Sequence, residues 1–193
     1  MTGIDRPTTS ADPTTDQAVR IRPERPDDHA AIGAVVAAAF GSPAEARLVE
    51  DIRASPGFVP DLSLVAEAGG QIVGHVMISY VTLDADDGGR RRVASLSPLA
   101  VRPDRQGRGI GGALVRAVVD RADDRGEPLV VLEGSPRYYG RFGFEHSVVH
   151  GIEIDLPSWA PPEAAQVRRL SRYDPALRGR VVYPPAFDQF AED

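Results

Sequence analysis

A glycine-rich segment in the second half of the chain has the residue types needed to bind a phosphate group. It reads QGRGIGG from Gln106 to Gly112 and leads into an amphipathic run that predicts a helix. Glycines at a helix start let the backbone approach a phosphate closely, and the free N–H groups and the helix dipole favour its negative charge. We therefore expect a phosphate-bearing ligand to bind at this segment.

The spacing of these glycines also fits a second interpretation. Gly107-x-Gly109-x-x-Gly112 matches the dinucleotide fingerprint, with Glu133 about 20 residues further on in the place of a ribose-binding acid. That fingerprint turns directly out of a strand, whereas residues 102–106 separate these glycines from the preceding strand-like run. Too few residues follow for the repeated βαβ units of a Rossmann domain, so we disfavour this interpretation. A glycine turn that only packs the helix on a strand is the remaining alternative.

Composition excludes several kinds of chemistry. Cysteine and lysine are absent, so all 22 basic residues are Arg, and a thiol nucleophile, a Schiff base and a Walker phosphate loop are ruled out. The formal net charge is −6, and the only basic run is Arg90-Arg91-Arg92, which argues against a nucleic-acid partner. No stretch approaches the roughly 20 apolar residues of a membrane helix, and no secretory signal is visible. We expect a cytoplasmic protein with no membrane partner.

The elements that position the glycine segment indicate a mixed α/β (α+β) fold. Apolar periodicity and turn residues predict strands at 19–23, 62–68, 71–83, 93–101, 129–132, 148–154, 166–170 and 180–183, and helices from Pro26, over 43–53, over 110–122 and over 136–141. The order gives an antiparallel meander followed by a β-α-β crossover. Residues 1–18 are rich in Thr, Asp and Pro and are expected to be a disordered tail. Residues 19–160 would form the main domain, with 161–193 as its C-terminal strand extension.

Two motifs resemble those of the GNAT superfamily of N-acetyltransferases. Gln106-x-x-Gly109-x-Gly111 fits the family's cofactor motif Q/R-x-x-G-x-G/A. The segment YYGRFGF, from Tyr138 to Phe144, fits its second signature, aromatic-Tyr-x-x-φ-Gly-Phe, where φ is apolar. The resemblance extends from about residue 19 to the end of the chain. It implies a mostly antiparallel sheet flanked by helices, with a splayed central strand pair into which the pantetheine arm of a cofactor inserts.

The resemblance also implies an activity and a set of site residues. The chain would transfer an acetyl group from acetyl-CoA to an amine of a small molecule or peptide by direct attack, acting as a monomer or homodimer. Tyr139 would be the general acid that protonates the departing thiolate. The residues expected to bind the cofactor are Leu99, Ala100, Val101, Gln106, Gly107, Arg108, Gly109, Ile110, Gly111, Gly112 and Ser135. The alternative is a domain that binds acyl-CoA as a sensor or structural ligand without turning it over.

The general base stays open at this point. Glu67, His75 and Glu133 are candidates by strand position, but we favour the interpretation that each is an ordinary exposed or hydrogen-bonded strand residue. The strand containing Ala94-Ser-Leu-Ser-Pro lacks the Glu that some family members use there, so a water-relayed proton path is plausible. His146-x-x-x-His150 has helical spacing but falls in an expected strand, so we expect no metal site.

Overall fold

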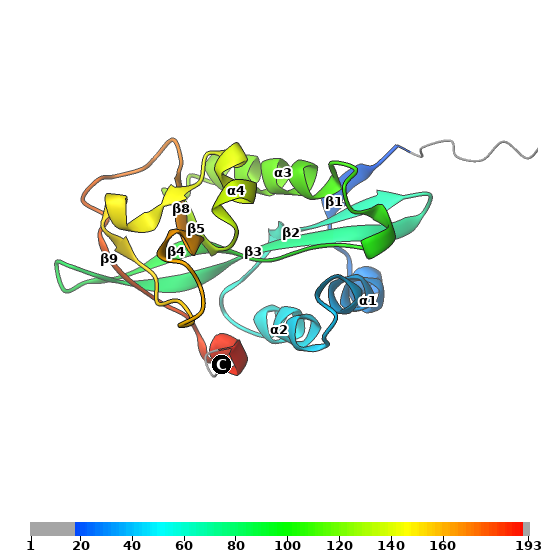
Figure 1. The fold of residues 1–193 in the computed structure, drawn as a ribbon, viewed down its shortest axis with the longest axis horizontal. Helices are drawn as coiled ribbons and strands as arrows, with labels where there is room; N and C mark the ends of the chain where they lie inside the picture. Colours follow the sequence, from blue (N-terminus) through cyan, green and yellow to red (C-terminus); the bar gives the residue numbers. More distant parts are fainter. Residues whose placement is uncertain (1–17, 191–193) are drawn as a thin grey trace, which may run out of the picture.

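The computed structural model describes residues 18–190, which form a mixed sheet with helices on both faces (Figure 1). The strands are β1 Arg20–Pro23, β2 Phe58–Ala68, β3 Gln71–Ala85, β4 Arg90–Val101, β5 Leu129–Glu133, β6 Glu145–His146, β7 Ile152–Glu153, β8 Ala165–Arg169 and β9 Gly179–Val182. The α-helices are α1 His29–Phe40, α2 Ala44–Arg53, α3 Ile110–Asp124 and α4 Pro136–Tyr139. Short 3-10 turns include η3 Gly140–Phe142, η4 Ser147–His150 and η6 Pro185–Phe190. The predicted tail, apart from its last residue, lies outside the described residues.

The sheet is mostly antiparallel, and this confirms the predicted fold class. Its strands follow the order β1-β2-β3-β4-β5-β8-β6, while β9 pairs with the outer end of β3 and with β7. The parallel pairs are β4 with β5 and β7 with β9. α3 covers one face, and α1 and α2 cover the other (Figure 1).

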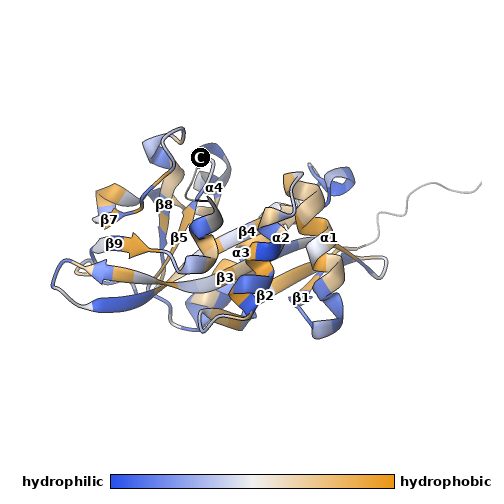
Figure 2. Cartoon of the chain, turned by 90° about the horizontal axis from the view of Figure 1, so that it is seen from below, coloured by the Kyte–Doolittle hydropathy of each residue, from blue (hydrophilic) through white to orange (hydrophobic). Residues whose placement is uncertain are grey.

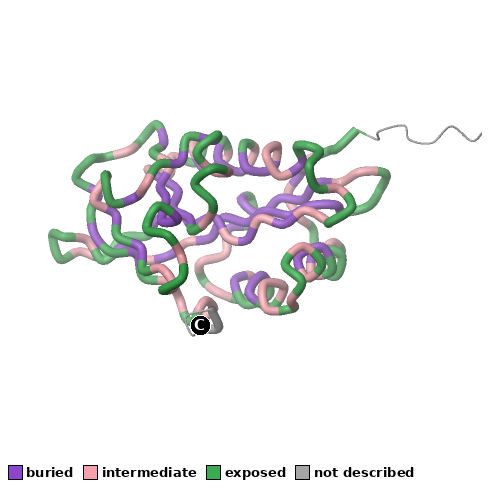
Figure 3. The backbone as a smooth tube through the Cα atoms, in the orientation of Figure 1, coloured by how far each residue is buried: buried purple, intermediate pink, exposed green. Residues whose placement is uncertain are grey.

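Each face of the sheet carries its own apolar core (Figures 2 and 3). On the α3 face, Leu114 and Val118 pack against β2 and β3 residues such as Leu64 and Val76, all fully buried. α3 can end where it does because Gly126 adopts a left-handed conformation with φ 82°. On the opposite face, the buried residues of α1 pack on β2, β3 and β4, with a second cluster at the β9 end of the sheet. Helices therefore hold β4 from both sides, whereas β5 is covered by α3 on one face and by the cluster at the β9 end on the other.

The predicted splay of the central strand pair is present. β4 and β5 pair only through Ala94 with Val130 and Ser95 with Val131. Beyond Ser95, β4 continues along β3 to its end, with a register shift between the pairs Ile78–Leu96 and Val76–Leu99. A bulge of this kind bends the strand that carries the extra residue. The backbone of β4 from Leu96 to Val101 therefore has no β5 partner.

Two local predictions were wrong in part. Residues 148–154 do not form one strand, because Ser147–His150 is the 3-10 turn η4, which ends at Gly151 with φ 72°. Only Ile152–Glu153 pairs, with β9. The β-branched Val148 and Val149 are exposed, so their strand preference finds no neighbouring surface to pack on. The short helix predicted over 136–141 ends as an α-helix at Tyr139 and continues as the turn η3.

Within the part of the chain that the structure describes, no helix combines the length and apolarity required to cross a membrane.

Candidate active site

A cleft of about 500 Å³ lies at the N-terminus of α3. The end of β4 and the glycine loop form one wall, and α4 with η3 forms the other. Its lining residues are Leu99, Val101, Arg105, Gln106, Gly107, Gly109, Ile110, Gly111, Gly112, Arg116, Tyr138, Arg141 and Phe142. The cleft opens beside the stretch of β4 that has no β5 partner, so backbone groups and a helix N-terminus share one concave site.

The glycine loop has the shape of a phosphate cradle. Gly107 and Gly109 have φ of 73° and 82°, a left-handed conformation that favours glycine. A Cβ atom added at either position would find no atom within 4 Å, so the space in front of the loop is open to a ligand. Gly109 is the N-cap of α3, and no side chain caps the helix there. The open space, the uncapped helix start and the arginines of the lining fit a pyrophosphate group.

The other two glycines of the motif have a packing role. A Cβ atom on Gly111 would lie 2.6 Å from the Tyr138 hydroxyl oxygen, and one on Gly112 would lie 3.2 Å from the Phe142 ring. Real Cβ atoms essentially never approach as closely as the first of these distances. Glycine at these positions therefore lets the first turn of α3 lie against the aromatic segment, which sets the width of the cleft.

The predicted cofactor-binding residues divide into two groups in the structure. Most of them line the cleft, but Ala100, Arg108 and Ser135 do not. Ala100 is buried against the α1 side of the sheet. Ser135 is the N-cap of α4, and its carbonyl oxygen accepts hydrogen bonds from Tyr138 and Tyr139. Arg108 lies within the glycine loop and is exposed, although it does not line the cleft.

Gln106 lines the cleft, yet its side chain is turned back to β4. Its Nε2 atom donates a hydrogen bond of 3.0 Å to the carbonyl oxygen of Val101. Because Gln106 begins the glycine loop and Val101 ends β4, this bond fixes the loop against the strand. Arg102, between them, donates its backbone N–H to the carbonyl oxygen of Val73 on β3. Both bonds thus tie the start of the loop to the sheet.

The two adjacent tyrosines face different surroundings. Tyr138 lines the cleft, whereas the half-buried ring of Tyr139 packs against the backbone of Gly134, at the end of β5, and against Phe144. The two rings meet edge to face, with centroids 5.0 Å apart. Burial, with a smaller contribution from Tyr138, raises the pKa of Tyr139 well above that of a free phenol. Tyr139 therefore keeps its proton at neutral pH and stands beside the splayed end of β5.

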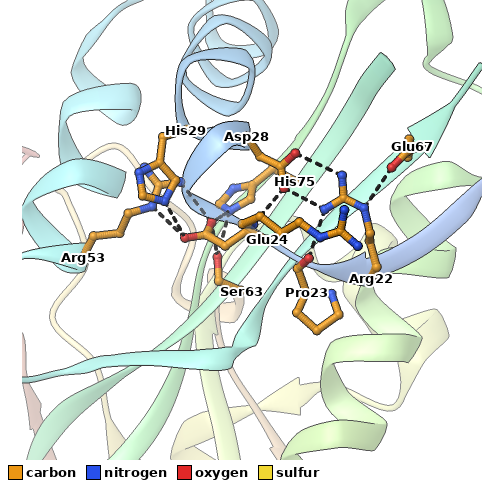
Figure 4. A network of polar contacts seen from close by, with 10 residues as sticks. Arg22, Pro23, Glu24, Asp28, His29, Arg53, Ser63, Glu67 and His75 are labelled. Carbon is orange, nitrogen blue, oxygen red and sulfur yellow. Dashed lines mark hydrogen bonds and ion pairs between the residues drawn. The ribbon is translucent and has the colours of Figure 1, made fainter. Parts of the chain in front are cut away.

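Two of the three base candidates belong to a polar network beneath α1 and α2 (Figure 4). His75 is fully buried, and its Nε2 atom lies 3.1 Å from the Ser63 hydroxyl and 3.3 Å from the Glu24 carboxylate. Glu24 also accepts hydrogen bonds from Arg53. Burial lowers the pKa of His75, so the imidazole is neutral. These contacts hold α2 on the sheet.

Glu67, the second candidate in this network, accepts a hydrogen bond of 2.8 Å from Arg22. Arg22 is itself paired with Asp28, before α1. Arg22 of β1 thus forms an ion pair with each carboxylate. One pair ties β1 to β2, and the other ties β1 to the segment that precedes α1. Glu67 and His75 therefore have structural partners, and neither lines the cleft.

The third candidate, Glu133, lies elsewhere. It ends β5, immediately before the Gly134 that contacts Tyr139, and its surface is partly exposed. The hydroxyl of Tyr183, just after β9, is placed to donate to its carboxylate. Sequence analysis did not identify Tyr183, because its approach depends on β9 pairing with a distant strand. The one signal in the sequence was that the family resemblance extends to the end of the chain.

The histidine pair does not form a metal site. His146 lies on β6, while His150 ends η4 and its Nε2 atom lies 2.6 Å from the Glu145 carboxylate. Among residues 18–190 there is no group of three or more His, Asp or Glu side chains that could hold a metal ion.

Comparison with known proteins agrees with this geometry. Residues 20–147 match the family model of the acetyltransferase (GNAT) domain. The chain is 37% identical over 174 residues to the uncharacterized N-acetyltransferase YhbS of Escherichia coli K12, which covers 88% of this chain and 99% of that protein. The crystal structure of E. coli YhbS in complex with CoA aligns with a TM-score of 0.80 at 33% identity, covering 94% and 97% of the two chains. A GNAT acetyltransferase from Brucella melitensis in complex with acetyl-CoA aligns with a TM-score of 0.72 at 33% identity, covering 89% and 99%.

A splayed strand pair beside a glycine-capped helix defines a class of CoA-dependent acyltransferases. The chain belongs to the GNAT acetyltransferase family. It is an acetyl-CoA-dependent acetyltransferase, with acetyl-CoA as its co-substrate.

Proposed function

We propose that the enzyme transfers the acetyl group directly to an amine of a small molecule or peptide. The observation that carries this proposal is the continuity of the site. The open space in front of Gly107 and Gly109 runs along Leu99 and Val101, the part of β4 that β5 leaves unpaired. Acetyl-CoA bound there supplies an activated thioester.

The chain's own groups divide the work of holding the co-substrate. The backbone of the loop from Gly107 to Gly111 and the N-terminus of α3 face the pyrophosphate, and Arg105, Arg116 and Arg141 supply positive charge around it. The backbone groups of Leu99 and Val101 pair with the amide groups of the pantetheine arm, in place of the missing strand.

Direct attack is favoured because the cleft offers no activated nucleophile of its own. Among the residues that line it there is no serine, threonine, histidine or carboxylate, and cysteine is absent from the whole sequence. Burial raises the pKa of Tyr138, so its phenol keeps its proton and is a weak nucleophile. A covalent acetyl-enzyme would need a stronger, activated group. The amine must therefore meet the thioester in a ternary complex.

Tyr139 is the proposed general acid. Its raised pKa keeps the phenol protonated, and its ring is fixed by Gly134 and Phe144 beside the splayed end of β5. A phenol is a weaker acid than a thiol, so the leaving sulfur gains from a short hydrogen bond more than from full proton transfer. We therefore expect a contribution of about 10²-fold, at the low end for general acid catalysis.

A panel of amines tests the proposal. The protein is incubated with acetyl-CoA and each amine, while thiol release and amide formation are followed together. We expect both products in equal amounts with at least one amine. Tight acetyl-CoA binding with no amide from any amine would favour the alternative, a sensor or structural domain that binds acyl-CoA without turnover. Binding of NADH in place of CoA would contradict the cofactor site itself.

A further inference from the structure

Polar residues gather on the face of the sheet opposite α3, at the base of the splay. Val130 and Leu132 of β5 pack in the α3-side core, so the alternate residues Val131 and Glu133 point to the other face. Ser95 is the last β4 residue paired with β5, and by the same alternation it shares this face. Glu133 lies two positions beyond that last pair, where the two strands have begun to part.

The C-terminal segment brings Tyr183 to the same place. Val182, the last residue of β9, pairs with Thr82 on β3, and the chain then turns toward α2 (Figure 1). The Tyr183 ring stacks on Phe187 of η6 with centroids 4.9 Å apart, and Phe187 packs in the core beneath α1 and α2. The ring of Tyr183 is thereby held in place, and its hydroxyl interacts with the Glu133 carboxylate.

Two buried hydroxyls add to this group. Ser79 on β3 and Ser95 on β4 are cross-strand partners, and neither side chain has a hydrogen-bond partner among the described residues. Burial is the largest cause that raises the pKa of Tyr183, Glu133 raises it further, and Ser95 opposes this shift. Unpartnered buried hydroxyls are rare because each one forgoes its hydrogen bonds with water. They indicate that this part of the sheet is adapted to receive a polar group.

We propose that Glu133, held by Tyr183, is the carboxylate that binds the acceptor as an ammonium ion and accepts its proton. This inference rests on the proposed function and names the catalytic partner of Tyr139. The two groups flank the end of β5: Tyr139 lies against Gly134, on the α3 side, and Glu133 points to the opposite face. An amine that approaches along Glu133 reaches the splay from the side opposite the cofactor cleft.

The charge balance of this face suits an alkylammonium group. The charged and titratable groups that act on Glu133 are Tyr183 and Asp155. Desolvation raises the pKa of Glu133, Asp155 raises it further, and the hydrogen bond from Tyr183 lowers it. Desolvation lowers the pKa of a bound ammonium ion. The difference between that pKa and the pKa of Glu133 is therefore smaller in the ternary complex.

The step balances as follows. The ammonium loses one proton to Glu133, and the freed nitrogen lone pair forms the nitrogen–carbon bond while the carbon–sulfur bond breaks. Tyr139 donates a hydrogen bond to the leaving sulfur and passes its proton on only as it is itself reprotonated. The nitrogen's surplus proton passes to water, which reprotonates Tyr139, and Glu133 releases its proton to solvent. The products are the amide, free CoA and one proton.

The test uses Glu133→Gln and Tyr183→Phe in the full chain, with n-butylamine as the acceptor. We expect Glu133→Gln to lower kcat/KM for the amine by about 10²-fold and to remove the acidic limb of its pH profile, with CoA affinity unchanged. Tyr183→Phe removes only a hydrogen bond that lowers the pKa of Glu133, so the acidic limb should move to higher pH. The matched controls are Asp120→Asn, an exposed acid on α3, and Tyr173→Phe, a half-buried tyrosine of the β9-side core. Both should keep the wild-type profile.

The outcomes separate this inference from the proposed function. Amide formation that Glu133→Gln leaves unchanged would overturn the role of Glu133 and leave amine acetylation standing. If the wild type forms no amide, binding of butylammonium to the CoA complex is measured in its place. Binding that Glu133→Gln weakens would support the acceptor site and overturn direct transfer to an alkylamine. Absence of both turnover and Glu133-dependent binding would overturn both.

Discussion

The two sides of the splayed strand pair are built in different ways. On the cofactor side, the phosphate cradle comes from one continuous segment, in which backbone groups and glycines extend from the end of β4 to the start of α3. The acceptor side is assembled from β3, β4, the end of β5 and the segment after β9, and its groups are side chains. The difference teaches that a shared co-substrate can be held by a local motif, whereas the proposed acceptor site consists of residues that only the tertiary fold brings together.

Gly109→Val should give the largest effect, and it tests the cofactor side. The side chain would fill the open space in front of α3 and deny the pyrophosphate its place. We expect CoA affinity to fall by about 10³-fold, equivalent to the loss of two charge-assisted hydrogen bonds. Calorimetric titration with CoA measures the change.

Gly88→Val is the matched control for this substitution. Gly88 has the same φ of 82° and equally open surroundings, but it lies in the turn between β3 and β4. Both variants therefore carry the same backbone strain. Equal CoA affinity in the two variants would show that the loop does not hold the pyrophosphate.

Tyr139→Phe should have the next largest effect. It tests the proposed general acid, which lies at the end of β5 between the cofactor side and the acceptor side. The substitution keeps the ring and removes the proton, so kcat should fall by about 10²-fold while CoA affinity and Tm stay unchanged. Tyr138→Phe is the control, because Tyr138 lines the cleft but is not the predicted acid. A larger loss of kcat in Tyr138→Phe than in Tyr139→Phe would show that Tyr138, and not Tyr139, is the general acid.

Acid should weaken the α1 and α2 side of the molecule, because only that side depends on the network around Glu24. The folded-state pKa of His75 lies below its unfolded value near 6.5, so below that pH the unfolded chain binds a proton that the folded chain does not. The free energy of unfolding should therefore fall by up to about 1.4 kcal/mol per pH unit. Below about pH 4.5 it should fall further, because the folded-state pKa of Glu24 is also depressed.

Urea unfolding at a series of pH values measures this slope. His75→Gln should flatten it in the range just below pH 6.5, whereas His150→Gln, a change remote from the network, should keep it. A slope that survives His75→Gln would assign the acid sensitivity to other groups.

Deletion of residues 1–18 should have the smallest effect. Their Thr-, Asp- and Pro-rich composition offers few large apolar side chains with which to pack on the domain. We expect neither Tm nor CoA affinity to change. A clear fall in either quantity, measured by thermal unfolding and titration, would show that this segment contributes to the fold or to the site.

The comparison also explains what could be predicted from the sequence. The glycine segment is a local signal, because Gly107 and Gly109 must adopt positive φ where the helix begins, and no distant residue decides this. The aromatic segment and the order of strands were predictable for similar reasons. The strand predicted over 148–154 failed because Val148 and Val149 find no sheet surface to cover.

Polar contacts between distant segments could not be predicted. His75 reads as a polar strand residue, and nothing local shows that it is buried between Ser63 and Glu24. The approach of Tyr183 to Glu133 depends on β9 adding to the outer end of β3, which is a property of the whole sheet. The acceptor side is therefore the part of the site for which the structure adds most.

The most direct test of the account is an initial-rate study in which acetyl-CoA and an amine acceptor are varied together. The account requires both substrates to meet across the splay in one ternary complex, so it predicts intersecting double-reciprocal plots and no acetylated protein after incubation with acetyl-CoA alone. Parallel plots, together with an acetyl-enzyme that passes its acetyl group to the amine, would contradict it.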